Sequence, residues 1–166
     1  RGAMVAMAGS QATMIIYFWG NDRLQNFETI CGCTGAGPTF DGCDAVQTHM
    51  TNTRGTDPEM LEFRFPVRLE EWSIRRGSGG KGAHRGGDGC TRRMRFLERM
   101  TVTTLCSHRR VQPFGVDGGE PGQVGHEWIE RAGGSRTEHA GNDQSEVLPG
   151  DVFVMETPAG GGFGKA

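Results

Sequence analysis

Residues 72–89 read W-S-I-R-R-G-S-G-G-K-G-A-H-R-G-G-D-G, and this stretch decides the fold of the chain. Seven of the thirteen positions between Gly77 and Gly89 are glycine. Because glycine has no Cβ, it adopts positive φ easily and lets other backbone approach closely, so this density disfavours both helix and regular strand. The stretch predicts a structural loop of tight turns, with positive φ at several of its glycines: Gly77, Gly79, Gly80, Gly82, Gly86, Gly87 and Gly89.

The same region carries a local excess of positive charge. From Arg75 to Arg95, seven basic residues stand against one acidic residue, Asp88, in a chain whose formal net charge is −2. Residues 111–166 compensate with nine acidic residues against three basic ones. Such asymmetry indicates a region that meets an anion or an acidic surface. The sequence pI of about 6.2, and the absence of aromatic residues interleaved with the arginines, argue against a nucleic-acid partner.

Length and composition indicate one domain-sized segment, residues 1–166, with a sub-boundary near residue 60. A chain of 166 residues can bury a real core, although 28 of them are glycine. The sub-boundary separates a glycine-rich and polar loop region from a β-rich region. The sequence starts at Arg1 without an initiator methionine and stops just after a glycine run, so we expect the C-terminal segment of a larger multidomain protein.

The cysteines and the apolar runs indicate in which cellular compartment the protein is found. Five cysteines are an odd number, and Cys31 and Cys33 are separated by one residue rather than the two of a common zinc knuckle. We therefore expect no metal in this segment and reduced thiols in a cytoplasmic protein. The apolar runs 3–8 and 12–19 are far shorter than the ~20 residues of a membrane span, so no membrane partner is expected.

Alternating apolar residues predict a mainly β fold with little helix, α+β overall, in which glycine-rich turns join short strands. Phe63, Phe65, Val67 and Leu69 alternate, and the phase slips at Glu70-Glu71, as a β-bulge would require. Further strands are expected at 14–19, around 94–96 and 100–102, in a hairpin of 127–131 with 136–139, and at 152–157, where apolar residues on both faces indicate a central strand.

His49 and Asp57 are the candidate catalytic residues. They lie eight residues apart in a polar stretch, H-M-T-N-T-R-G-T-D-P-E, and a histidine with a carboxylate can share a proton-transfer role. The alternative is a histidine held in a rigid loop by local hydrogen bonds.

Four cations are the candidate substrate-binding residues: Lys81, Arg85, Arg109 and Arg110. Arginine suits bidentate contact with a carboxylate or phosphate, and we expect the four to converge in space. The alternative is a salt-bridged interface with further domains. The run Gly160-Gly161-Gly162 lacks the Lys-Ser/Thr of a phosphate-binding loop and is not a predicted nucleotide site.

Six motifs in one order resemble the hydantoinase B/5-oxoprolinase family, in the C-terminal part of its B-type subunit or domain. The resemblance covers nearly the whole chain and is closest to the 5-oxoprolinase branch. Ala159 and Cys33 depart from it, since glycine is usual at both places. The motifs are F-W-G-N-D-R, E-T-I-C-G-C-T-G-A-G-P, H-M-T-N-T-R-G-T-D-P-E, R-R-G-S-G-G-K-G with R-G-G-D-G, S-H-R-R with P-F-G-V-D-G-G-E-P-G, and P-G-D-V-F-V-M-E-T-P-A-G-G-G-F-G.

The resemblance implies part of an ATP-dependent cyclic-amide hydrolase that converts 5-oxoproline and ATP into glutamate, ADP and phosphate. A hydantoinase A-type domain or subunit would bind ATP and phosphorylate the lactam oxygen, and the B-type part would assist ring opening. ATP and a divalent metal are expected outside this segment, which would be inactive alone and belong to an oligomer. The alternatives are a hydantoinase or ketone-carboxylase sibling, or a non-catalytic anion-binding, RNA-binding or scaffold segment.

Overall fold

The computed structural model describes residues 6–12 and 15–166, and within these ranges the chain forms nine strands and one helix. The prediction of a mainly β chain with little helix is confirmed. The elements are β1 (Ile15–Gly20), β2 (Gln25–Thr29), α1 (Pro58–Arg64), β3 (Val67–Ile74), β4 (Cys90–Phe96), β5 (Met100–Cys106), β6 (His126–Glu130), β7 (Arg136–His139), β8 (Asn142–Val147) and β9 (Val152–Glu156). No helix of the described residues is long and apolar enough to cross a membrane.

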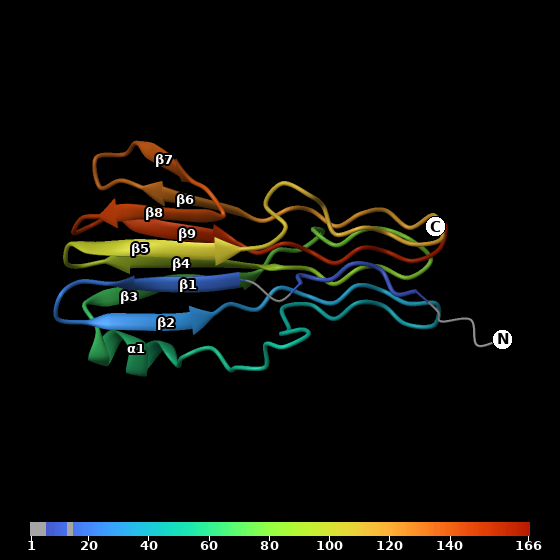
Figure 1. Cartoon of the computed structure of the whole chain (residues 1–166), viewed down its shortest axis with the longest axis horizontal. Coiled ribbons are helices and arrows are strands. Elements are labelled where there is room, and N and C mark those ends of the chain that lie inside the picture. The colour runs from blue at the N-terminus through green and yellow to red at the C-terminus, as the bar shows by residue number, and fades with distance from the viewer. Residues whose placement is uncertain (1–5, 13–14) are drawn as a thin grey trace.

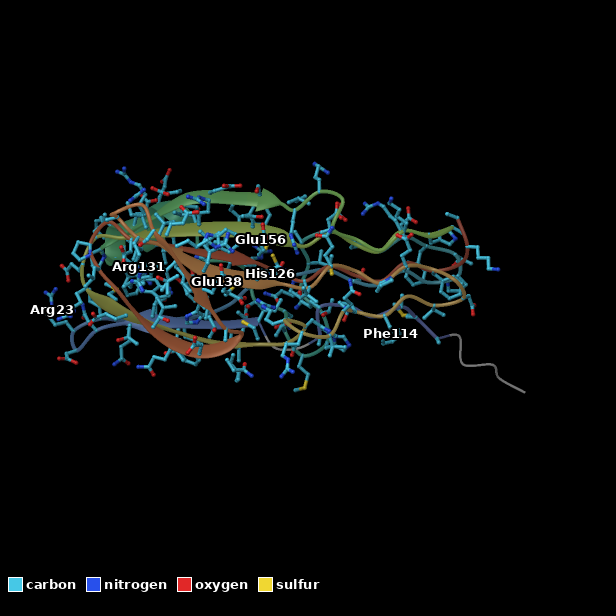
Figure 2. All side chains as sticks on the ribbon, turned by 90° about the horizontal axis from the view of Figure 1, so that it is seen from above. Arg23, Phe114, His126, Arg131, Glu138 and Glu156 are labelled. Carbon is cyan, nitrogen blue, oxygen red and sulfur yellow. The ribbon has the colours of Figure 1, made fainter. Side chains whose placement is uncertain are left out.

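Two antiparallel sheets form a sandwich. One has the order β2-β1-β5-β8 and the other β3-β4-β9-β6-β7, and the two lie as separate layers in Figure 2. Side chains alternate between buried and half-exposed along β4, because successive residues of a strand point to opposite faces. The core between the sheets is aromatic at its centre, where Tyr17 of β1 stacks on Phe153 of β9 with ring centroids 5.1 Å apart.

Most of the strand predictions are confirmed. The register of β3 against β4 shifts between Leu69 and Glu71, which is the bulge that the phase slip predicted. β6 and β7 form the expected hairpin, and β9 lies in the middle of its sheet. β1 covers the expected strand from Ile15, whereas Met14 lies outside the described residues.

The prediction of a strand through Phe63 and Phe65 is wrong, because residues 58–64 form helix α1. Asp57 caps this helix by accepting from the backbone of Glu59 and Met60, and proline occupies its first position. Asp-Pro-Glu is a strong helix-start signal, and it outweighs the apolar alternation that follows it. Phe63 is 85% exposed, so the apolar spacing there marks no buried strand face.

Away from the strands, the other half of the molecule consists of extended segments that run side by side (Figure 1). We call this half the glycine bundle; it comprises residues 8–11, 32–37, 78–89, 113–123 and 158–164. Main-chain hydrogen bonds join the segments directly, as from Gly80 N to Gly160 O at 2.8 Å and from Ala36 N to Gly161 O at 3.0 Å. Residues 158–164 bond to all four other segments and form the centre of the bundle.

The hydrogen bonds of residues 159–164 repeat every third residue. Donors three residues apart bond to the same or adjoining segments: Ala159 and Gly162 to Gln123 and Glu120, Gly160 and Phe163 to Gly87 and His84, and Gly161 and Gly164 to Gly9 and Val116. Three residues per turn, without internal hydrogen bonds, is the geometry of a polyproline II-type helix. The segment therefore shares its main-chain groups among neighbours on three sides.

Close approach, rather than positive φ, explains most glycines of the 77–89 loop. Between Gly77 and Gly89, positive φ occurs at Gly77 alone, so the prediction of several such residues is wrong. A Cβ on Gly80 or Gly87 would instead run into the main chain of a neighbouring segment, at Glu120 and Cys43 respectively. The physical reason is that the missing Cβ of glycine permits either positive φ or close approach of another backbone, and in the bundle most of these glycines serve the close approach.

The sub-boundary expected near residue 60 falls inside α1. Strands from both sides of this position pair with each other, since β1 pairs with β5 over six residues in register from Ile15↔Cys106 to Gly20↔Thr101. Residues before and after position 60 thus share one sheet.

Candidate functional site

The densest group of ionisable side chains surrounds a hollow of about 500 Å³ at the end of the sandwich nearest the glycine bundle. We call it the Arg109 hollow. It lies where β5 ends and β6 begins, and Figure 2 labels His126 and Glu138, which come from the adjacent strands β6 and β7. Its ionisable or amide lining residues are His108, Arg109, Arg110, His126, Glu127, Glu138, His139 and Asn142.

Arg109 forms the wall of this hollow through a buried ion pair with Glu127. Its Nε donates to Glu127 Oε1 at 2.7 Å, Nη2 donates to the same oxygen, and Nη1 donates to the Ser107 carbonyl at 2.7 Å. The two side chains are 8% and 1% exposed. Burial alone would lower the pKa of the Arg109 guanidinium, but the hydrogen bond to Glu127 together with the nearby negative charge raises it. Arg109 is thus fully engaged within the protein.

The histidines of the hollow differ in their surroundings. His139 is completely buried, with Nε2 2.9 Å from Thr104 Oγ1 and Nδ1 2.9 Å from Ser145 Oγ, and burial lowers its pKa. His126 is exposed, and His108 donates from Nδ1 to the Val111 carbonyl at 2.8 Å. Arg110 is also exposed. His126, Arg110 and Glu138 are therefore the exposed ionisable side chains of the hollow.

The four candidate cations are dispersed. Arg109 and Arg110 share the Arg109 hollow, whereas Arg85 makes a bidentate pair with Asp44 at 2.7 and 3.2 Å. That pair lowers the pKa of Asp44. Lys81 is exposed, and its carbonyl accepts from the Glu120 backbone inside the glycine bundle. None of the three described hollows is lined by all four cations.

The positive excess of residues 75–95 is largely neutralised by acidic residues from distant parts of the chain. Glu28 meets Arg92 at 2.8 Å across the two sheets, and both side chains are almost completely buried. Five of the seven cations have such partners: Arg75 with Glu156, Arg85 with Asp44, Arg92 with Glu28, Arg93 with Glu130 and Arg95 with Glu70. The loop's one acid, Asp88, is itself buried and accepts from the backbone of Gly77 and Gly79.

His49 and Asp57 line different hollows. His49 has φ 57°, is exposed, and places Nδ1 3.1 Å from Thr48 Oγ1 beside a hollow of about 560 Å³ that Ser10 and Phe114 also line. Asp57 lies on the rim of a third hollow, of about 770 Å³, and its Oδ1 is occupied by the helix-cap bonds.

Sequence reasoning missed the third hollow. It opens between β2, β3 and the 45–58 loop, with Ile30, Leu69 and Trp72 among its apolar lining and Cys31 and Arg92 among its polar groups. The sequence spacing of Cys31 relates it to Cys33, whereas its contact in space is Cys90, 59 residues away. No local pattern could have indicated that pairing.

The glycine run of residues 160–162 offers no phosphate cradle, and the described residues offer no cluster of metal ligands. The backbone amides of Gly160, Gly161 and Gly162 all donate to other segments of the bundle, so they cannot cradle a phosphate. No group of three His, Cys, Asp or Glu side chains close enough to hold a metal ion occurs in residues 6–12 and 15–166.

The fold recurs within larger chains of known structure. Two solved structures share it: a nucleotide-free acetone carboxylase (TM-score 0.77, 19% identity, 95% of this chain and 26% of that one) and the ATP-dependent caprolactamase from Pseudomonas jessenii (TM-score 0.77, 24% identity, 99% and 31%).

Residues 2–166 match the sequence profile of the Hydantoinase B/oxoprolinase family, and the chain belongs to that family. The 5-oxoprolinase of Dictyostelium discoideum is 42% identical over 163 residues, which are 98% of this chain but 13% of that protein. The resemblance stated from the motifs is therefore confirmed, and the chain corresponds to a segment of its relatives.

Proposed function

We propose that this chain is a segment of an ATP-dependent cyclic-amide hydrolase of the 5-oxoprolinase type, which converts 5-oxoproline to glutamate. The 42% identity to a 5-oxoprolinase across 98% of the chain carries the proposal. The segment would work in an oligomer with a hydantoinase A-type domain or subunit, in the cytoplasm. ATP and a divalent metal would bind outside this segment, since the amides of residues 160–162 are engaged within the bundle and residues 6–12 and 15–166 hold no group of metal ligands.

Within this proposal, the Arg109 hollow receives the substrate carboxylate. Arg110 supplies the charge, since it is exposed on the hollow, whereas Arg109 holds the wall through Glu127. Lys81 and Arg85 act at the contact with other domains. An exposed cation at a partly enclosed site attracts an anion more strongly than one on a flat surface, because the local dielectric is lower.

His49 is the proposed proton-transfer residue. Its imidazole is exposed at the second hollow, where it can reach both solvent and a bound solute. Asp57 acts on it only through the placement of helix α1, since its carboxylate caps that helix.

The test is a chimera in which this chain replaces the aligned stretch of the Dictyostelium 5-oxoprolinase. We expect ATP-dependent release of glutamate from 5-oxoproline, and none from the isolated 166 residues. Arg110→Glu should abolish turnover, while Arg23→Glu, a matched charge reversal at the far end of the sandwich (Figure 2), should leave it unchanged. A folded chimera that hydrolyses a hydantoin but not 5-oxoproline, or turnover by the isolated chain, contradicts the proposal.

A further inference from the structure

Two thiols that are distant in the sequence lie next to each other at the junction of the sandwich and the glycine bundle. The Sγ atoms of Cys31 and Cys90 are 3.8 Å apart, and Cys90 Sγ also donates to the Cys31 carbonyl at 3.1 Å. A disulfide bond has its sulfurs about 2.05 Å apart, so the two side-chain ends need to approach by only about 1.8 Å. All five cysteines of the chain are free thiols.

The two thiols differ in access and in acidity. Cys31 is partly exposed and lines the third hollow, whereas Cys90 is completely buried. The hydrogen bond from Cys90 lowers the pKa of Cys31, and the charge of Arg92 acts in the same direction. The same interaction, together with burial, raises the pKa of Cys90. A thiolate is the reactive form of cysteine, so Cys31 is placed to react first and Cys90 second.

We propose that Cys31 and Cys90 form a peroxide-reactive thiol pair, a modification site reached through the third hollow. The Cys31 thiolate attacks one oxygen of hydrogen peroxide, the O–O bond breaks, and the departing hydroxide takes up a proton to leave as water. Cys90 then attacks the sulfur of the resulting sulfenic acid, the S–O bond breaks, and a second water leaves with the Cys90 proton. Two thiols and one peroxide yield one disulfide and two waters.

The bond would join the two sheets of the sandwich. Cys31 follows β2, the edge strand of one sheet, and Cys90 is the first residue of β4 in the other. Cys90 N also donates to Thr157 Oγ1 at 2.8 Å, just where the chain leaves β9 for the centre of the glycine bundle. A disulfide here would therefore fix the base from which that central segment extends.

The chain contains its own controls. Cys33 and Cys106 are buried, and burial raises both pKa values, that of Cys106 to about 12. Cys43 is exposed on a loop. If exposure alone governed reactivity, Cys43 would react before Cys31.

The experiment treats the folded chain with a small excess of hydrogen peroxide, blocks the remaining thiols with N-ethylmaleimide, and maps the peptides by mass spectrometry. We expect titratable thiols to fall from five to three, with a Cys31–Cys90 linked peptide and a loss of two hydrogens. Cys31→Ser should abolish the link, whereas Cys43→Ser should leave it unchanged. A full count of five thiols after treatment, a Cys31–Cys33 link, or oxidation confined to Cys43 would overturn the proposal.

The order of the two steps is tested with Cys90→Ser and dimedone, a reagent that traps sulfenic acids. We expect dimedone on Cys31 in this variant and several-fold less in the parent chain, where Cys90 resolves the intermediate. Equal labelling of both proteins contradicts the assigned order. If Cys90→Ser is unfolded at the assay temperature, the peptide maps of the parent chain and of Cys31→Ser still establish which two cysteines pair.

Discussion

In the sandwich, the chain is held by side chains packed between two sheets, whereas in the glycine bundle it is held by main-chain hydrogen bonds between segments that approach too closely at most of their glycines to admit a side chain. Tyr17 and Phe153 represent the first arrangement, and Gly80 and Gly160 the second. Stability in the sandwich comes from buried apolar area, and in the bundle from backbone pairing at close approach. We therefore expect the bundle to be destabilised by substitutions that add side-chain volume, and the sandwich by substitutions that remove it.

The largest effect is expected from adding volume to the bundle. Gly80→Val and Gly87→Val place a Cβ where main-chain oxygens of Glu120 and Cys43 already lie, and rigid backbone cannot withdraw as a flexible side chain can. We expect each to reduce the free energy of unfolding by about 4 kcal/mol or more, at the extreme of point mutations. Gly133→Val, at an open hairpin turn, is the matched control and should cost less than about 1 kcal/mol. Urea denaturation measures all three, and parent-like midpoints for the bundle variants would show that the loop is merely flexible.

Removing volume from the sandwich should come next. Phe153→Ala deletes a ring that is 2% exposed and stacked on Tyr17, at an expected cost of about 3 to 4 kcal/mol from lost burial and the cavity left behind. Phe153→Leu retains most of the volume and should cost less than about 1.5 kcal/mol. Thermal melts of both variants measure these losses of stability. Equal losses for Phe153→Ala and Phe153→Leu would show that the stability of the core does not depend on side-chain volume at this position.

A smaller effect is expected at helix α1, which packs on the sandwich through the buried Leu61. Asp57→Ala removes the N-cap acceptor and should cost about 1 kcal/mol, whereas Asp57→Asn should restore most of it. Chemical denaturation provides the stability readout. In the chimera, Asp57→Asn should also retain turnover, because the amide still caps the helix. An amide cannot transfer a proton as a carboxylate does, so this variant separates the capping role from a catalytic one. Loss of turnover at unchanged stability would make Asp57 catalytic after all.

The smallest effect is a pH dependence that arises from a buried histidine of the sandwich. Burial lowers the pKa of His139 below its usual value of 6.5, so the unfolded chain binds a proton more readily than the folded one. Stability should therefore be complete above about pH 7 and decline as the pH falls below 6.5. Urea midpoints at pH 7.5 and 5.5 measure this loss, which His139→Gln should reduce. His126→Gln, at an exposed position, should leave the slope unchanged.

The sequence predicts the sandwich better than the bundle, because the apolar alternation that indicates a strand lies within the strand's own residues. The alternation along β3 and its slip at Glu70 located even the bulge. Helix α1 is the exception, because its capping signal Asp-Pro-Glu stands at the end of a polar stretch that otherwise favours a loop. The three-residue repeat of the central segment could not be found in this way, because every partner of residues 159–164 belongs to another segment.

The candidate site likewise contains contacts between residues that lie far apart in the sequence, which a local pattern does not show. The positive excess around Arg85 and Arg93 was visible in the sequence, but their partners Asp44 and Glu130 lie more than thirty residues away. Charge counted within a window therefore overstated what is free to bind an anion. The Cys31–Cys90 contact was invisible for the same reason, since a long-range pair leaves no spacing signature.

The position of residues 158–164 at the centre of the bundle also governs how this half is assembled during synthesis. The segments that surround it are made first, and each lacks the central partner for its main-chain groups until the ribosome has delivered the last one. The sheet that contains β9 shares this delay, because its middle strand comes just before residues 158–164, whereas β1 and β2 can pair as soon as residues 15–29 emerge. Nascent chains of this protein should thus hold an extended, hydrated glycine-rich half until residues 158–164 have emerged.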